Sequence, residues 1–160
     1  MADLSQALYA AVEQNDLEAL WQLLDAGVGY HPAPGQSPLL SVAVERGYAE
    51  IAALLLEYGH APDAPDAAGF TPLIQAITRH DAVLVKTLLR HGATPDAPTL
   101  TPIRRMPPLA YAREDPQPNA AIIAALLEQL AARYPGLASP ADLEAVSYTH
   151  LRAHETVLDL

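Results

Sequence analysis

Four histidines precede residue 146 and could in principle bind a metal ion: His31, His60, His80 and His91. A zinc site needs several such ligands to converge, and a zinc-binding helix achieves this with histidines a few residues apart. None of the four has that close spacing, and the sequence contains no cysteine. We therefore predict that these histidines are structural or exposed to solvent, and that the protein binds no metal.

Patterns typical of catalytic sites are also missing from the sequence. It contains no Gly-x-Gly-x-x-Gly, phosphate-binding loop or Gly-x-Ser-x-Gly, and no serine has an evident histidine partner. Asp63 and Asp66 could form a pair of catalytic carboxylates, but we interpret them as residues that shape a loop. We predict that the protein is not an enzyme and uses no cofactor.

The charge of the chain limits its partners. The 160 residues include 19 acidic and 9 basic ones, for a formal net charge of -10. This charge disfavours nucleic acid, whose affinity depends on neutralisation of phosphates by Lys and Arg. Residues 1–70 hold ten acids against Arg46 alone, whereas residues 71–145 hold seven acids and seven bases. The acidic half either steers a basic partner or only keeps the protein soluble.

The cellular setting can also be predicted from the sequence. No apolar run approaches the roughly 20 residues that cross a membrane. Met1-Ala2-Asp3 places an acid where a signal peptide would be basic, and the lack of cysteine fits a reducing compartment. We expect a monomeric cytoplasmic protein that binds neither membranes nor nucleic acid.

A repeat defines the elements that position these residues. Gly27, Gly59 and Gly92 end similar segments at intervals of 32 and 33 residues. Before each glycine, apolar residues follow in steps of four and one, which places them on one face of a helix. They are Ala19, Leu23 and Leu24, then Ile51, Leu55 and Leu56, then Leu84, Leu88 and Leu89. A shorter helix precedes each of these, and one such helix pair cannot bury its own apolar face. The sequence therefore predicts an all-α solenoid of stacked helix pairs.

The connection before the third repeat carries the most specific motif. It reads Gly59-His60-Ala61-Pro62-Asp63-Ala64-Pro65-Asp66-Ala67-Ala68-Gly69-Phe70-Thr71-Pro72-Leu73. Gly35-Gln36-Ser37-Pro38-Leu39 repeats its last five positions, with Ser for Thr. The motif resembles the ankyrin repeat, G-A-x-x-N-A-x-D-x-x-G-x-T-P-L, although Leu40 and Ile74 replace the family histidine. The resemblance covers residues 5–134 and implies an ankyrin-repeat solenoid of about four helix-turn-helix units joined by hairpin loops.

Local signals predict where the helices begin and end. We expect the hydroxyl groups of Thr71 and Ser37 to cap the first helix of their repeats, with Pro72 and Pro38 at the first helical position. Gly59 and Gly92 follow the last turn of the second helices. We expect them to end these helices in a left-handed conformation, which glycine adopts at little cost.

The predicted organisation is one ankyrin-repeat domain at residues 1–138. Its repeats lie at about 3–35, 36–68, 69–100 and 101–136. The fourth repeat has a longer preceding connection and the insertion Asp115-Pro116-Gln117-Pro118 between its helices. Ser139 begins a segment, residues 139–145, with the start signals of a further helix that we expect to be truncated.

The family resemblance implies that a partner is held by the hairpin tips and the exposed face of the first helices. Mapped onto this chain, the predicted partner-binding residues are Tyr30, His31, Glu45, Arg46, Asp66, Phe70, Gln75, Thr78, Arg79, Arg104, Arg105 and Met106. Phe70 either contacts a partner or packs against the neighbouring hairpin. Trp21 is expected on the outer face of its helix, in contact with the N-terminal segment rather than with a partner.

These observations predict a non-catalytic module for protein-protein interaction. A more specific hypothesis is an acidic inhibitor of a basic protein, in the manner of an immunity protein that covers a toxin's active site. The alternative hypothesis is an adaptor or targeting segment of a longer multidomain protein.

The C-terminal residues 146–160 differ in character from everything before them. Eleven consecutive residues, Val146-Ser147-Tyr148-Thr149-His150-Leu151-Arg152-Ala153-His154-Glu155-Thr156, match the translation of a transposon-end sequencing adapter. We interpret this tail as adapter-derived and therefore as no part of the functional protein.

This interpretation predicts the genomic sequence. Re-amplification of the locus from source DNA should show codons for other residues, or a stop codon, after the codon for Ala145. Recovery of the same codons for residues 146–160 would show that the tail is natural.

Overall fold

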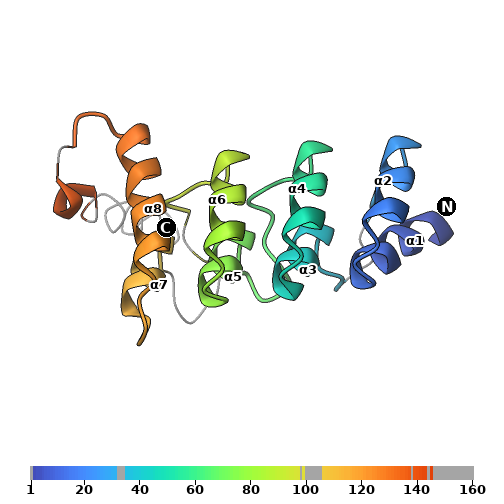
Figure 1. The fold of residues 1–160 in the computed structure, drawn as a ribbon, viewed down its shortest axis with the longest axis horizontal. Coiled ribbons are helices and arrows are strands. Elements are labelled where there is room, and N and C mark those ends of the chain that lie inside the picture. Colours follow the sequence, from blue (N-terminus) through green and yellow to red (C-terminus); the bar gives the residue numbers. More distant parts are fainter. Residues whose placement is uncertain are drawn as a thin grey trace, which may run out of the picture.

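Helices alternate in two rows along the part of the chain that the computed structural model describes. The described residues are 2–31, 35–97, 99, 106–137, 139–143 and 145. The first helices of the repeats, here called A helices, are α1 (Ala2–Glu13), α3 (Leu39–Arg46), α5 (Pro72–Thr78) and α7 (Pro108–Glu114). The second or B helices are α2 (Leu17–Asp25), α4 (Ala49–Glu57), α6 (Ala82–Arg90) and α8 (Ala120–Arg133). Figure 1 shows the B helices side by side in front and the A helices behind them.

The apolar core runs through the whole stack. Each A helix packs on the next A helix and each B helix on the next B helix, so that every repeat covers its neighbour. Leu55 and Leu88, two of the apolar positions of the repeat, are fully buried. In the first repeat Ala19 and Leu23 are only partly buried, because α2 has a B-helix neighbour on one side only. The arrangement confirms the predicted all-α solenoid.

The helix starts confirm one predicted cap and correct the other. The Thr71 hydroxyl oxygen accepts a hydrogen bond from the Ile74 amide at 3.4 Å, and Pro72 is the first helical residue. In the second repeat α3 begins one residue later, so that Pro38 stands at the cap and makes no side-chain capping bond. Instead, the Ser37 carbonyl accepts a hydrogen bond from the Tyr30 hydroxyl group at 3.2 Å. The expectation of a Ser37 cap is therefore wrong.

The tight turn between the A and B helices requires a left-handed residue. Asn15, Gly47 and His80 occupy the same place in three successive repeats, with φ of 54, 79 and 57°. Gly47 is also crowded, since a Cβ there would lie 2.5 Å from Nη2 of Arg79. His80 therefore has a structural role, as the left-handed residue of a turn. Its ring lies 3.4 Å from a carboxylate oxygen of Asp115.

Successive hairpin loops are tied together by buried or partly buried acids. The Asp63 carboxylate accepts hydrogen bonds from the Thr94 amide at 2.9 Å and the Thr94 hydroxyl at 2.6 Å. One repeat later, Asp96 accepts a hydrogen bond from the Tyr134 hydroxyl at 2.5 Å and lies 3.6 Å from Nε of Arg133. Asp63 and Asp96 therefore connect one repeat to the next. This agrees with the interpretation of Asp63 as a residue that shapes a loop.

The fourth repeat follows the predicted order, with residues 115–119 joining α7 to α8. Beyond α8, the Ser139 hydroxyl oxygen accepts a hydrogen bond from the Asp142 amide at 3.1 Å, which confirms Ser139 as the cap of the next helical segment. Leu143 of that segment is 5% exposed and belongs to the core. The C-terminal tail, residues 146–160, lies outside the described residues.

Among the described residues, no helix has the length and apolarity that a membrane span requires. The same part of the chain contains no group of three or more His, Asp or Glu side chains that could hold a metal ion.

The hairpin ties give a prediction on stability. Asp63→Ala removes both acceptors used by Thr94, and we expect the free energy of unfolding to fall by about 2 kcal/mol. Thr94→Val, which loses only the hydroxyl donor, should cost about half as much. Urea denaturation followed by circular dichroism measures both.

The matched control is Asp25→Ala, which removes an exposed carboxylate from the last turn of α2. It should change the stability by no more than about 0.5 kcal/mol. Equal losses at Asp25 and Asp63 would contradict a tie between the hairpins.

Candidate binding surfaces

The predicted residues at the ends of the A helices bridge neighbouring repeats. Arg46 of α3 forms an ion pair with Glu13 of α1 at 3.3 Å. Arg79, which follows α5, donates a hydrogen bond to the Glu45 carbonyl oxygen at 2.6 Å. Thr78 is exposed and bonds back to its own helix. All five residues stay at least partly open to solvent, so the same row links the repeats and presents charge.

Asp66 organises the hairpin before the third repeat. One carboxylate oxygen accepts hydrogen bonds from the Ala68 and Phe70 amides, both at 2.9 Å. The other accepts a hydrogen bond from the Gln75 side-chain nitrogen at 2.8 Å, which connects the hairpin to α5. Phe70 is partly buried, so its exposure does not distinguish a partner contact from packing against the hairpin. The structure thus brings Asp66 and Phe70, predicted on the hairpin tip, together with Gln75, predicted on the A helix.

Hydrogen bonds join the first hairpin to α1 before it and to the segment that precedes α3. His31 is exposed, and its backbone amide and carbonyl both lie 3.3 Å from the Ser5 hydroxyl oxygen of α1. Tyr30 is partly buried, and burial, with a smaller contribution from Tyr9, raises the pKa of its hydroxyl above the usual value. Of these two predicted residues, His31 is therefore the more open to solvent.

The third connection contains three of the predicted residues. Arg104 and Arg105 lie outside the described residues. Met106 is only 7% exposed, and its backbone pairs with Thr99. The prediction that Met106 is a contact at an exposed tip is therefore wrong, because its side chain packs inward at the start of the fourth repeat.

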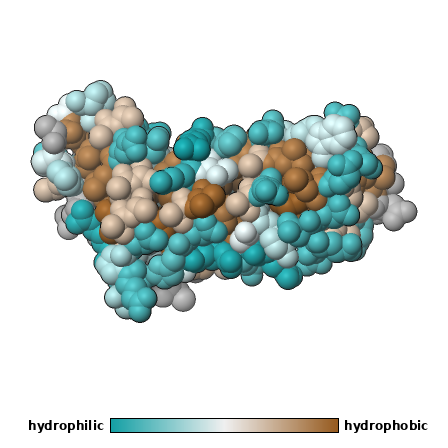
Figure 2. Space-filling model, in the orientation of Figure 1, coloured by the Kyte–Doolittle hydropathy of each residue, from teal (hydrophilic) through white to brown (hydrophobic). Residues whose placement is uncertain are grey.

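A groove on the opposite, B-helix side was missed by sequence reasoning. It lies between α2 and α4 and has a volume of about 490 Å³. Seven residues line it: Leu17, Glu18, Trp21, Glu50, Ala53, Leu54 and Glu57. Figure 2 shows apolar surface gathered over this part of the molecule and bordered by hydrophilic surface. We call it the α2–α4 groove.

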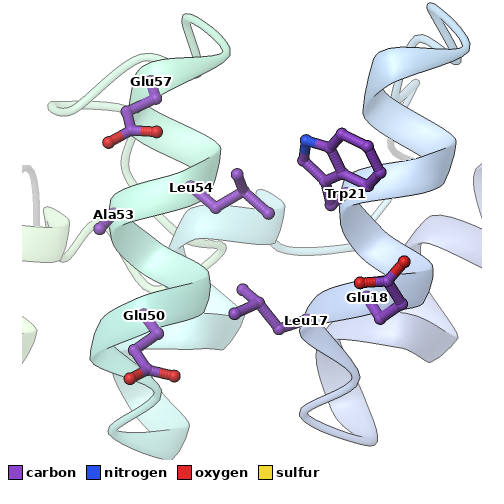
Figure 3. A pocket seen from close by; sticks show the side chains of 7 residues that line it. All are labelled: Leu17, Glu18, Trp21, Glu50, Ala53, Leu54 and Glu57. Atoms are coloured by element: carbon purple, nitrogen blue, oxygen red, sulfur yellow. The ribbon is translucent and has the colours of Figure 1, made fainter.

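Side chains from the two helices face one another across this groove (Figure 3). Leu17 of α2 and Leu54 of α4 point toward each other, and Trp21 lies next to Leu17 along α2. Trp21 is 45% exposed and lies on the outer face of its helix, as predicted. Among the described residues, none from the N-terminal helix α1 lines the groove beside it. Leu17 and Trp21 are four residues apart, a spacing that could have indicated a second apolar face on α2.

Comparison with known proteins identifies the repeat. The family described as ankyrin repeats, three copies, matches residues 8–99, which is more than half of the 160 residues. The ARF GTPase-activating protein GIT1 of Homo sapiens is 39% identical over 74 residues, 44% of this chain and 10% of that protein. The same protein from Mus musculus and Rattus norvegicus matches equally well. The chain thus spans about a tenth of the length of these curated relatives.

The A-helix and hairpin residues differ in what their removal should cost. Asp66→Ala leaves two backbone amides and the Gln75 side chain without their acceptor, and we expect a loss of about 2 kcal/mol in the free energy of unfolding. Arg46→Ala breaks only an exposed ion pair and should cost no more than about 0.5 kcal/mol. Thermal and urea unfolding of the two variants test this difference. If Arg46→Ala proved as destabilising as Asp66→Ala, the A-helix row would be chiefly structural.

Proposed function

This chain belongs to the ankyrin-repeat family, and we propose that it is a non-catalytic module that binds and inhibits a basic protein. Ankyrin-repeat domains are in general protein-interaction modules. The finer part of the proposal, the basic character of the partner, rests on one observation. The acidic half of the sequence coincides with the first two repeats and the hairpin that follows them.

The acids of this half lie on the surface and on both rows of helices. Glu13 and Glu45 are exposed near the ends of α1 and α3, on the A-helix side. Glu18, Glu50 and Glu57 are exposed on α2 and α4. A one-signed potential of this kind raises the rate of encounter with an oppositely charged partner, and salt screens it.

The proposed contact surface is the A-helix row together with the hairpin tips. It presents the exposed His31, Glu45, Arg46 and Thr78 beside the more buried Phe70. Its backbone is held by the Asp66 and Asp63 hydrogen bonds. A surface fixed in this way loses little conformational entropy when it binds, which supports use as a rigid inhibitor.

A second candidate function is that of an adaptor or targeting segment of a longer multidomain protein. The observation that favours it is the match to GIT1, where the similar segment makes up 10% of a much larger protein. The genomic sequence after codon 145 separates the two candidates. A stop codon nearby favours the free-standing inhibitor, and codons for another domain favour the adaptor.

Partner binding should depend on salt and on acids of the A-helix side. We expect the association rate constant with a partner captured from the source cells to fall about tenfold between about 50 and 500 mM NaCl. The double variant Glu13→Gln and Glu45→Gln should lower that rate at low salt, as measured by surface plasmon resonance.

Glu128→Gln on α8 is a control for position, because it removes one exposed acid from the balanced half. It should leave the rate nearly unchanged. Capture of acidic partners only, or binding that is indifferent to salt, would refute the proposal.

A further inference from the structure

We propose that the α2–α4 groove is a second binding surface, which holds an amphipathic helix of a partner protein with apolar residues flanked by Lys or Arg. It lies on the B-helix side, away from the A-helix and hairpin surface. The inference does not rest on the proposed inhibitor function, since the groove could serve a free-standing protein or an adaptor alike.

The floor of the groove is unusually apolar for an exposed helix face. Trp21 is 45% exposed and Leu17 39% exposed, and they stand next to the partly buried Leu54. Single exposed apolar residues need no explanation, but an apolar cluster rimmed by polar residues is typical of an interaction site. The volume of about 490 Å³ lies within the range of ligand sites, roughly 300–1,000 Å³.

The other repeats provide an internal comparison. At the place of Trp21 in α2, the next B helices have Ala53 and Lys86, and at the place of Leu17 they have Ala49 and Ala82. The stack therefore does not require large apolar residues at these positions.

A groove farther along the B row has a different character. It lies between α6 and α8, has a volume of about 210 Å³, and is lined by Lys86, Leu89, Arg90, Ala125, Glu128 and Gln129. Charges of both signs meet there, whereas the α2–α4 groove has acids alone. The apolar and acidic combination thus belongs to the first two repeats and is no general property of the solenoid.

The charges of the groove specify the occupant. Glu18, Glu50 and Glu57 are exposed, and within the described part of the chain none of them forms an ion pair. Glu18 accepts a hydrogen bond from the Gln22 side chain, at 2.8 Å. A Lys or Arg side chain would find a carboxylate on either side of the groove, and the exposed Trp21 ring offers a further contact for a cation.

The spacing of the acids fits a helix as the occupant. Glu50 and Glu57 are seven residues apart on α4, which is about two turns or roughly 10 Å along the axis. Basic residues seven apart on a bound helix would face both of them, with apolar residues between to cover Leu17, Trp21 and Leu54. The groove lies between two helices, and the described residues offer no strand edge there for an extended peptide to join.

The only tryptophan of the chain reports directly on this groove. The probe is a designed helical peptide of Leu, Ala and Lys that lacks Trp and Tyr, with lysines seven residues apart. We expect it to shift the Trp21 emission to shorter wavelength in a saturable manner, because the ring leaves water. The same peptide with Glu in place of Lys should cause no shift.

Variants of the full chain distinguish the groove from general attraction to an acidic protein. Glu50→Gln with Glu57→Gln should weaken peptide binding about tenfold. Glu13→Gln with Glu45→Gln removes the same charge on the A-helix side and should leave it within about twofold. Trp21→Ala installs the residue that α4 has at this place, and should abolish binding of a dye-labelled peptide while the circular dichroism stays unchanged.

Three results would overturn the inference. One is equal weakening by the two double variants, which would show that only net charge matters. Another is equal binding of the Glu-containing peptide. The third is a concentration-dependent dimer that Trp21→Ala dissociates in sedimentation experiments, because the groove would then be covered by a second copy of the chain. Each result leaves the proposed inhibitor function standing, since that function is tested on the other face by salt dependence.

Discussion

The structure depends on one constraint, which is that a single pair of short helices cannot bury its own apolar face. Helices of seven to nine residues, such as α5 and α4, are too short to be stable alone in water. They persist because each covers the next, and residues such as Leu55 and Leu88 become fully buried only in the stack. The spacing between repeats, the turns and the loops all serve to keep neighbouring pairs in contact.

This constraint also decides the roles of the polar residues. Asp63 and Asp96 lie 33 residues apart, one repeat, and each accepts hydrogen bonds from a residue farther along the stack. Arg79 similarly reaches from its repeat to the Glu45 carbonyl. Side chains that resemble catalytic or recognition groups in the sequence are therefore used to hold the backbone of the solenoid. A partner would meet a surface whose polar groups are already ordered.

The structural features that recur in every repeat could be predicted from the sequence. Features that occur at a single place in the stack could not. The helix pairs, the Thr71 cap and the role of Asp63 follow from fixed offsets within the repeat. The delayed start of α3 does not, because it is accompanied by the Tyr30 hydroxyl bond to the Ser37 carbonyl. Met106 was misjudged because the depth of a loop residue depends on the packing of the next helix. The α2–α4 groove was missed because Trp21 and Leu54 meet only after stacking.

Stacking also leaves one set of positions free to vary. The inward face of each B helix is committed to the core, so Leu55 and Leu88 recur with the repeat, whereas the outward position is Trp21, Ala53 and Lys86 in turn. On the A-helix side, by contrast, Arg46 and Arg79 bridge repeats and cannot change without loss of a contact. Grooves between B helices can therefore acquire different chemistry while the stack stays the same. A solenoid of this kind can present two chemically independent faces from one short chain.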